Sequence, residues 1–168
     1  MPMSGINQPD FICVDENLRL KKYEGDCAFA LDWYQDEETL LMVDGKYQPY
    51  DLDRLYRMYE YLQKRGEVYF IEILCENKKS WVPIGDVSFW QNDMPIVIGK
   101  QKFRGRGIGE KVVLALVERA KTLGFSYVEV ADIYDYNLPS IRMFEKCGFF
   151  PVEKTEKGHR YRRCIQKK

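Results

Sequence analysis

Two spacings of apolar residues occur along the chain, and together they divide it into strands and helices. Apolar residues at every second position indicate a strand, and apolar residues at every third or fourth position indicate a helix. The expected elements, in chain order, are a strand over 12–23, helices over 26–33 and 51–65, strands over 67–74, 81–90 and 95–103, a helix over 108–123, a strand over 126–133, a helix over 138–147, and strands over 149–155 and 159–165. The acidic segment 35–45 is either a short second helix or a loop.

The ends of the predicted helices carry residues that suit those positions. Asp26 is a candidate N-cap for the first helix, because a short acidic side chain can accept a hydrogen bond from the first free backbone amides. Gly66, Gly124 and Gly148 each follow a helical pattern and are suitable stops.

The order of the elements indicates an α/β protein. An antiparallel meander precedes a β-α-β unit, which predicts a mixed, mostly antiparallel central sheet with helices on both faces. Because β-α-β connections are right-handed, the strand that ends at Phe103 should run parallel to the strand that starts at Ser126. We expect one domain over residues 1–168, with residues 1–10 as a loose N-terminal arm.

A glycine-rich turn stands between the strand 95–103 and the helix that follows. Glycines alternate with other residues in Arg104-Gly105-Arg106-Gly107-Ile108-Gly109, and they free the backbone for conformations that a Cβ would block. The amides of the turn and the first amides of the helix form a cradle for an anion, beside the charges of Arg104 and Arg106. The dinucleotide fingerprint and the P-loop both require glycine where Glu110 stands, so neither motif is present.

Charge is divided unequally between the two halves of the chain. Residues 1–99 hold 10 Lys and Arg against 18 Asp and Glu, a balance of −8, and residues 100–168 hold 16 against 8, a balance of +8. The basic half suits the phosphates of a cofactor, and the acidic half suits a cationic second substrate. A nucleic-acid face is the alternative for the basic half, but its cations are mixed with acids and no nucleic-acid motif is present.

Cysteine usage and hydropathy indicate the compartment. The five cysteines are an odd number with wide spacings and no CxxC, which argues against both a disulfide framework and a zinc site. No apolar run reaches transmembrane length, and the N-terminal residues lack the pattern of a signal peptide. We therefore expect a cytoplasmic protein with no membrane partner and no metal.

A second motif follows the strand 126–133. The segment 137–149 reads NLPSIRMFEKCGF, with Asn137, Ser140, Phe144, Gly148 and Phe149 at the positions of the pattern N-x-x-[SA]-x-x-x-[YF]-x-x-x-G-F. Taken alone, this segment is best interpreted as a capped amphipathic helix, and the alternative interpretation of the glycine turn is an ordinary strand-to-helix turn. With the R-x-x-G-x-G turn before it in the right order, the chain resembles the GNAT superfamily of acetyltransferases. Within it, DIYDYNLPSIRMFEKCGF is most similar to the aminoglycoside 6'-N-acetyltransferases and the ribosomal-protein alanine N-acetyltransferases.

The resemblance implies a fold, a reaction and a cofactor site. It implies the GNAT-type acyl-CoA N-acyltransferase fold, in which two strands diverge past the turn and coenzyme A lies in the opening. It implies an N-acetyltransferase that moves acetyl from acetyl-CoA to a primary amine by direct attack, without a metal. The residues it assigns to the cofactor are Ile98, Gly99, Lys100, Gln101, Arg104, Gly105, Arg106, Gly107, Ile108, Gly109, Glu110, Asn137, Ser140 and Phe144. A backbone amide within 98–101 should polarise the thioester, and Gly99 could allow the strand bulge that exposes it.

Asp132 is the candidate general base. Both groups of relatives carry an acid five positions before the asparagine, which here is Asn137. Asp132 shares a strand face with Val128 and Val130, whereas Glu129 points the other way, so the acid should end an apolar row where a pKa can be raised. The alternative is a surface aspartate at a strand end.

No dedicated general acid is evident. Many relatives have a tyrosine where this chain has Phe144, so the departing thiolate takes its proton from solvent or from Tyr134 or Tyr136, whose simpler roles are packing and loop contacts. His159 is interpreted as structural. Asp86 faces either the substrate or solvent.

The acceptor is expected to be a small cationic amine, such as an aminosugar. Its pocket would be built from the variable regions 25–50 and 81–94. The alternatives are a protein N-terminus as acceptor, or a module that binds coenzyme A with little catalysis. The chain is expected to be a monomer or a homodimer.

Overall fold

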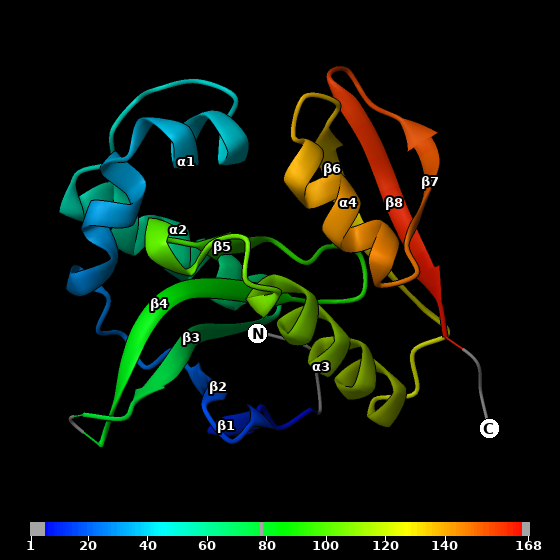
Figure 1. Cartoon of the computed structure of the whole chain (residues 1–168). Helices are drawn as coiled ribbons and strands as arrows, with labels where there is room; N and C mark the ends of the chain where they lie inside the picture. The colour runs from blue at the N-terminus through cyan, green and yellow to red at the C-terminus, as the bar shows by residue number, and fades with distance from the viewer. Residues whose placement is uncertain (1–5, 78, 166–168) are drawn as a thin grey trace. The chain divides into compact units, whose positions relative to one another are not determined.

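The computed structural model describes residues 6–77 and 79–165 (Figure 1). The described chain forms two compact units, and each unit is made of two separate stretches of the sequence. The first unit comprises the residues up to Ser88 together with Ile96–Arg106, and the second comprises Phe89–Pro95 and the residues from Gly107 onward. The prediction of one domain over residues 1–168 stays a prediction.

Five strands form the sheet of the first unit, in the order β1-β2-β3-β4-β5. Their bounds are β1 Phe11–Asp15, β2 Leu18–Lys22, β3 Glu67–Cys75, β4 Ser80–Phe89 and β5 Ile96–Ile98. The strand predicted over 12–23 is therefore wrong in its centre, where β1 and β2 form an antiparallel hairpin. Asp15 causes the break, because its carboxylate accepts the Asn17 N–H at 2.8 Å and closes a tight turn.

Three helices precede β3. They are the 3₁₀ helix η1 Ala28–Gln35, and the α-helices α1 Glu37–Val43 and α2 Leu52–Arg65. Asp36 and Asp51 cap α1 and α2 by accepting backbone N–H groups three residues on, so the segment 35–45 is a short helix. The prediction that Asp26 caps the first helix is wrong, since Cys27 occupies that position and forms no side-chain cap.

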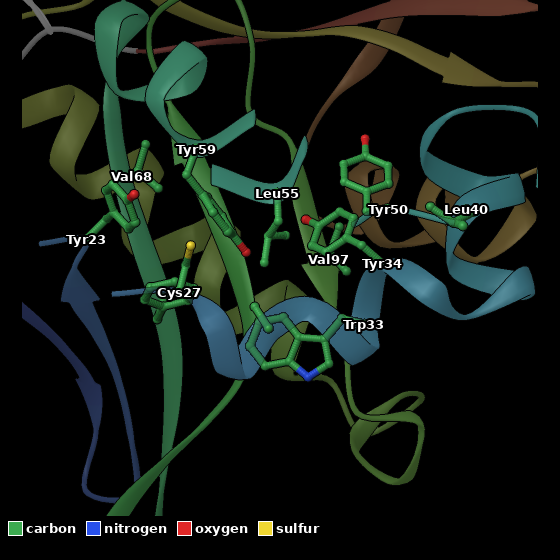
Figure 2. Packing of buried hydrophobic residues seen from close by; sticks show 12 residues of the cluster. Tyr23, Cys27, Trp33, Tyr34, Leu40, Tyr50, Leu55, Tyr59, Val68 and Val97 are labelled. Carbon is green, nitrogen blue, oxygen red and sulfur yellow. The ribbon is translucent and has the colours of Figure 1, made fainter. Parts of the chain in front are cut away.

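Aromatic residues dominate the core of the first unit (Figure 2). Tyr23 stacks on Tyr59 with ring centroids 5.3 Å apart, and Phe70 lies edge-on to both rings. Because α2 contributes Tyr59 and Leu55 to this cluster, its apolar face is held against the sheet as its helical spacing predicts.

The second unit contains two helices and a three-stranded antiparallel sheet in the order β6-β8-β7. Its elements are α3 Ile108–Thr122, β6 Tyr127–Tyr134, α4 Leu138–Lys146, β7 Phe150–Lys154 and β8 Gly158–Cys164. Arg163 Nη1 donates to the carbonyl of Cys147 at 2.7 Å and so ties the end of α4 to β8. These five elements confirm the sequence prediction for the second half of the chain.

The α/β fold class is confirmed, and the parallel direction expected for the strands before and after α3 stays a prediction, because these strands belong to different sheets and different units. β5 is the last strand of one sheet and β6 is the first strand of the other, so these two strands are not paired with each other. The strand predicted over 95–103 ends early, because the N–H groups of Gly99 and Lys100 both donate to Ile84 O, at 2.8 and 3.1 Å. Two residues opposite one form a bulge, and residues 101–103 then turn as the 3₁₀ helix η2 Gln101–Phe103.

The predicted loose arm lies partly outside the described residues, which begin at residue 6. Within the described part, Gln8 Nε2 donates to Val68 O at 3.0 Å, and Asp10 O accepts the Lys22 N–H at 2.9 Å. The arm is therefore hydrogen-bonded to the first unit from Gln8 onward.

All five cysteines are free. Cys13 and Cys164 are exposed, whereas Cys27 and Cys147 are buried. Burial raises the pKa of the Cys147 thiol to about 11, so this thiol stays protonated at neutral pH.

Candidate functional site

The glycine turn has the backbone conformation that its sequence predicts. Gly105 and Gly107 have φ angles of +73° and +79°, in the left-handed region that side chains other than glycine rarely adopt. Gly107 is the N-cap of α3 and supplies no side-chain hydrogen bond, so the first amides of this 15-residue helix have no side-chain cap. Such a helix start is suited to an anion.

The two arginines of the turn differ in their surroundings. Arg104 donates from Nε to Ile98 O at 2.8 Å and from Nη2 to Thr39 Oγ1 at 2.7 Å. Arg106 is exposed and lies over the ring of Phe103, with its guanidinium carbon 5.6 Å from the ring centroid. Arg106 is therefore the turn arginine whose charge faces solvent.

The end of β5 carries the bulge expected at Gly99. Since the Gly99 and Lys100 amides both bond to Ile84 O, neither is free to polarise a thioester. Ile98 faces Gly85 in the β4–β5 register, and amide directions alternate along a strand. The Ile98 N–H therefore points away from β4, toward the side of β5 on which the described sheet has no further strand.

The residues of the second motif lie at the start and core of α4. Asn137 caps this helix, accepting the Ser140 N–H at 3.4 Å, and it is buried. Phe144 is also buried and packs edge-on against Phe149, with centroids 5.1 Å apart. Phe144 is therefore part of the core of the second unit.

Asp132 lies at an exposed position on β6, where Thr155 Oγ1 donates to its Oδ1 at 2.7 Å. The expectation that it ends a buried apolar row is wrong, because the register of β6 against β8 shifts between Val130 and Ile133 and breaks the alternation. No observation in the structure tests whether Asp132 is the base, and that role stays a prediction.

Glu129 is buried on the same strand and is fully paired. Arg162 donates to one of its oxygens at 3.0 Å, and Asn92 and Arg160 donate to the other at 3.1 and 3.3 Å. Burial by itself would raise the pKa of Glu129, but these hydrogen bonds and charges hold it below its usual range. Glu129 is therefore a structural anion of the second unit.

Asp86 is the buried acid that sequence reasoning left undecided. Its Oδ2 accepts the hydroxyls of Tyr34 and Tyr59, both at 2.6 Å, and Figure 2 shows these two hydroxyls pointing toward each other. Burial raises the pKa of Asp86 to about 6, although both hydroxyl bonds act to lower it. The signal in the sequence is a lone acid inside the apolar strand PIGDVSF.

His159 forms a close pair with a carboxylate. Its Nδ1 lies 2.8 Å from Oδ1 of Asp135, a residue two positions before the N-cap of α4.

Tyr134 and Tyr136, the two candidate proton donors, stack on each other with ring centroids 5.5 Å apart.

Neither a metal-binding cluster nor a membrane-spanning helix is present in the described residues. They contain no group of three His, Cys, Asp or Glu side chains that could hold a metal ion. No helix among them is both long and apolar enough to cross a membrane.

Comparisons with known proteins point to one family. The family model described as "Acetyltransferase (GNAT) family" matches residues 27–149. Human alpha/beta-tubulin-N-acetyltransferase 9 is 28% identical over 138 residues, which are 72% of this chain and 65% of that protein. The chain thus matches less than two thirds of the length of this relative.

Two solved structures have the same fold at low identity. Aminoglycoside acetyltransferase AAC(6')-Ib in complex with ribostamycin and coenzyme A superposes with a TM-score of 0.72 at 18% identity, over 89% of this chain and 94% of that chain. Spermidine N-acetyltransferase from Vibrio cholerae, in complex with coenzyme A and spermine, superposes with a TM-score of 0.67 at 18% identity, over 89% and 96%.

Proposed function

Because the chain belongs to the GNAT acetyltransferase family, and is therefore an acyltransferase, we propose that it moves the acetyl group of acetyl-CoA directly to a primary amine. The observation that carries the proposal is the left-handed turn at Gly105 and Gly107, which leads into the uncapped start of α3. The phosphates of acetyl-CoA would bind the amides of residues 104–111, beside the exposed charge of Arg106. The pattern residues Asn137, Ser140 and Phe144 support α4 as the second cofactor element.

The Ile98 N–H is the donor that we assign to the thioester oxygen. The Ile98 N–H points away from β4, whereas the N–H groups of Gly99 and Lys100 are bonded to Ile84 O. A fixed amide lowers the barrier by stabilising negative charge as it develops on the oxygen. The Gly99 bulge supports this assignment, because it bends the strand directly after Ile98.

Asp132 would accept the proton that the attacking amine must lose, directly or through water. As the new nitrogen–carbon bond forms, the carbon–sulfur bond breaks and the thiolate leaves. Phe144 is buried and has no hydroxyl, so the thiolate would take its proton from water. A thiol pKa near 8.5 makes this chemically acceptable.

A small cationic amine is the acceptor we favour. The balance of −8 in residues 1–99 supports it, since acidic surface attracts cations. The structures of similar fold were solved with ribostamycin and with spermine, both amines. A protein amine is the second candidate, because the curated relative is named as a tubulin acetyltransferase. The five free cysteines support the expected cytoplasmic location.

The test measures thiol release from acetyl-CoA against aminosugars, polyamines and peptides with free N-termini. Acetyl-CoA should raise the melting temperature with concentration, because it binds the native state. Gly107→Glu should abolish this shift by its bulk and negative charge, while Lys121→Gln, at the far end of α3, should keep it. No shift and no heat in calorimetry with millimolar acetyl-CoA would refute the proposal. A shift without thiol release for any amine would indicate a module that only binds the cofactor.

A further inference from the structure

Arg104 and Thr39 connect the first turn of α1 to the end of β5, within the first unit. Arg104 Nη2 donates to Thr39 Oγ1 at 2.7 Å, and Thr39 Oγ1 donates onward to Asp36 Oδ2 at 2.9 Å. The same Asp36 oxygen accepts the Thr39 N–H and caps α1. A chain of hydrogen bonds therefore runs from the guanidinium to the helix cap.

The other side of the guanidinium faces the bulged strand end. Nε donates to Ile98 O at 2.8 Å, and Nη2 also lies 3.4 Å from Gly99 O. These carbonyls belong to the residue whose amide we assign to the thioester and to the bulge residue beside it. One side chain thus holds both this strand end and α1.

Two carboxylates complete the surroundings of Arg104. Asp36 Oδ2 lies 3.7 Å from Nη2, and Glu38 Oε2 lies 3.5 Å from Nη1. The Thr39 hydrogen bonds and the nearby Arg104 charge lower the pKa of Asp36. Because every nitrogen of the guanidinium faces an acceptor of the protein, a phosphate would have to compete with two carboxylates for it.

Packing supports the same arrangement. A Cβ added at Gly99 would overlap the ring of Trp33, so the 3₁₀ helix before α1 lies directly on the strand end. The next residue, Tyr34, is bonded to the buried Asp86 on β4. The segment 33–39 is therefore fixed to the sheet by a ring contact, a tyrosine–carboxylate bond and the Arg104 bridge.

From these contacts we infer that Arg104 is a positioning residue for the acceptor side of the site and not a ligand of the cofactor phosphates. It holds the acidic first turn of α1 beside Ile98, and this contact would position the acceptor amine next to the thioester. The inference rests on the proposed function, because it takes residues 25–50 as the acceptor side. Arg106 then supplies the cation for the phosphates.

The experiment compares two arginines of the same turn. In Arg104→Gln the KM of the preferred amine should rise about tenfold or more, because the charge-assisted bonds to α1 are lost. The Kd of acetyl-CoA should change less than about threefold, because Arg104 does not bind the phosphates. In Arg106→Gln the Kd of acetyl-CoA should rise and become less sensitive to salt, with the amine KM little changed. Arg57→Gln is the control, since Arg57 forms an exposed ion pair on α2.

Hydrogen exchange supplies a readout that does not depend on acetylation. The amides of α1 should exchange faster in Arg104→Gln than in the wild type, and they should be unchanged in Arg106→Gln. If no amine in the panel is acetylated, the proposed function fails, and the exchange of the α1 amides still decides the role of Arg104.

Thr39 gives an independent test should Arg104→Gln fail to fold. Thr39→Val keeps the shape and removes the hydroxyl, so it should raise the amine KM and the α1 exchange rate in the same direction. Thr39→Ser restores the hydroxyl and should restore both. When Arg104→Gln and Thr39→Val are combined, the effect on the amine KM and on α1 exchange should be smaller than the sum of the two single effects in free energy, because both variants break the same hydrogen-bond network. An Arg104→Gln protein with weakened acetyl-CoA binding, an unchanged amine KM and unchanged α1 exchange would overturn the inference.

Discussion

Asp86 shows how burial can change the chemistry of a carboxyl group without a charged neighbour. It is 3% exposed, and its hydrogen-bond donors are two uncharged tyrosine hydroxyls. The desolvation cost falls on the ionised form, so the pKa rises to about 6. A group with this property titrates within the range where enzymes are commonly assayed.

We predict that Asp86 makes stability depend on pH. Below its ordinary pKa of 3.8 the carboxyl is neutral in both the folded and the unfolded state. The free energy of unfolding should fall as the pH rises from there to about 6, because the carboxyl ionises in the unfolded chain before it ionises in the folded protein. The difference corresponds to about 3 kcal/mol. Urea unfolding at pH 4 and pH 7 measures it, and Asp86→Asn should remove this part of the slope.

Tyr34→Phe is the matched variant for this prediction. It keeps the carboxyl and removes one hydroxyl that lowers its pKa, so the fall in stability should extend to higher pH. Wild-type and Asp86→Asn curves that stay parallel from pH 4 to pH 7 would show that Asp86 does not titrate as stated.

Asp132→Asn tests the base at the same scale. The amide keeps the shape and the bond from Thr155 but cannot accept the amine proton, so kcat should fall by roughly 10²-fold or more. Calorimetry should give an unchanged Kd for acetyl-CoA. Full kcat on the true acceptor from pH 6 to 9 would remove Asp132 from the mechanism and leave the cofactor site unaffected.

At the scale of elements, prediction succeeded where one local pattern was decisive. The helix α2 was predicted over 51–65 from its apolar face and from Gly66 as its stop, and the structure has both, with Asp51 as the N-cap. The prediction of one strand over 12–23 was wrong, because the alternation of apolar residues continues across a tight turn that depends on one hydrogen bond to Asp15. The end of β5 was wrong because a bulge is set by pairing with Ile84, which lies far away in the sequence.

Gly99 is the element-scale test of the contact between η1 and β5. Gly99→Ala should destabilise the protein by about 1–3 kcal/mol, because the new methyl group would overlap the Trp33 ring. Denaturant unfolding measures the loss. Gly99→Ala combined with Trp33→Leu should recover part of it.

Gly105→Ala separates this steric cost from backbone strain. Nothing lies within 4 Å of a Cβ added at Gly105, but its φ of +73° makes an alanine strained there. The loss should be about 1–2 kcal/mol, and trimming Trp33 should not reduce it. Equal rescue of both variants would argue against a contact specific to Gly99.

At the scale of the whole molecule, the family could be predicted from two short motifs, whereas the geometry of the site could not. The motifs identify the turn, and glycine alone suits its left-handed residues. They do not show that Arg104 is bound by α1, since Thr39 and Arg104 are 65 positions apart. Likewise the exposure of Asp132 follows from a register shift between β6 and β8 that no local pattern marks.

The unequal charge of the chain predicts how salt should act. If the acidic residues of 1–99 attract a cationic acceptor, kcat/KM for a polycationic amine should fall as ionic strength rises. Steady-state assays between low and physiological salt measure this. An amine with a single charge is the control and should show a weaker dependence. A preferred acceptor with an acidic surface would contradict the prediction.

The exposure of the cysteines makes the chain suitable for site-directed labelling. Cys13 on β1 and Cys164 at the end of β8 are the two exposed thiols, and they belong to different units. Cys27 and Cys147 are buried, and burial raises the pKa of both thiols, which protects them from reagents that attack thiolates. With Cys75 replaced by serine, a donor dye and an acceptor dye on Cys13 and Cys164 would report by fluorescence energy transfer how far apart the two units lie in solution, and whether acetyl-CoA changes that distance.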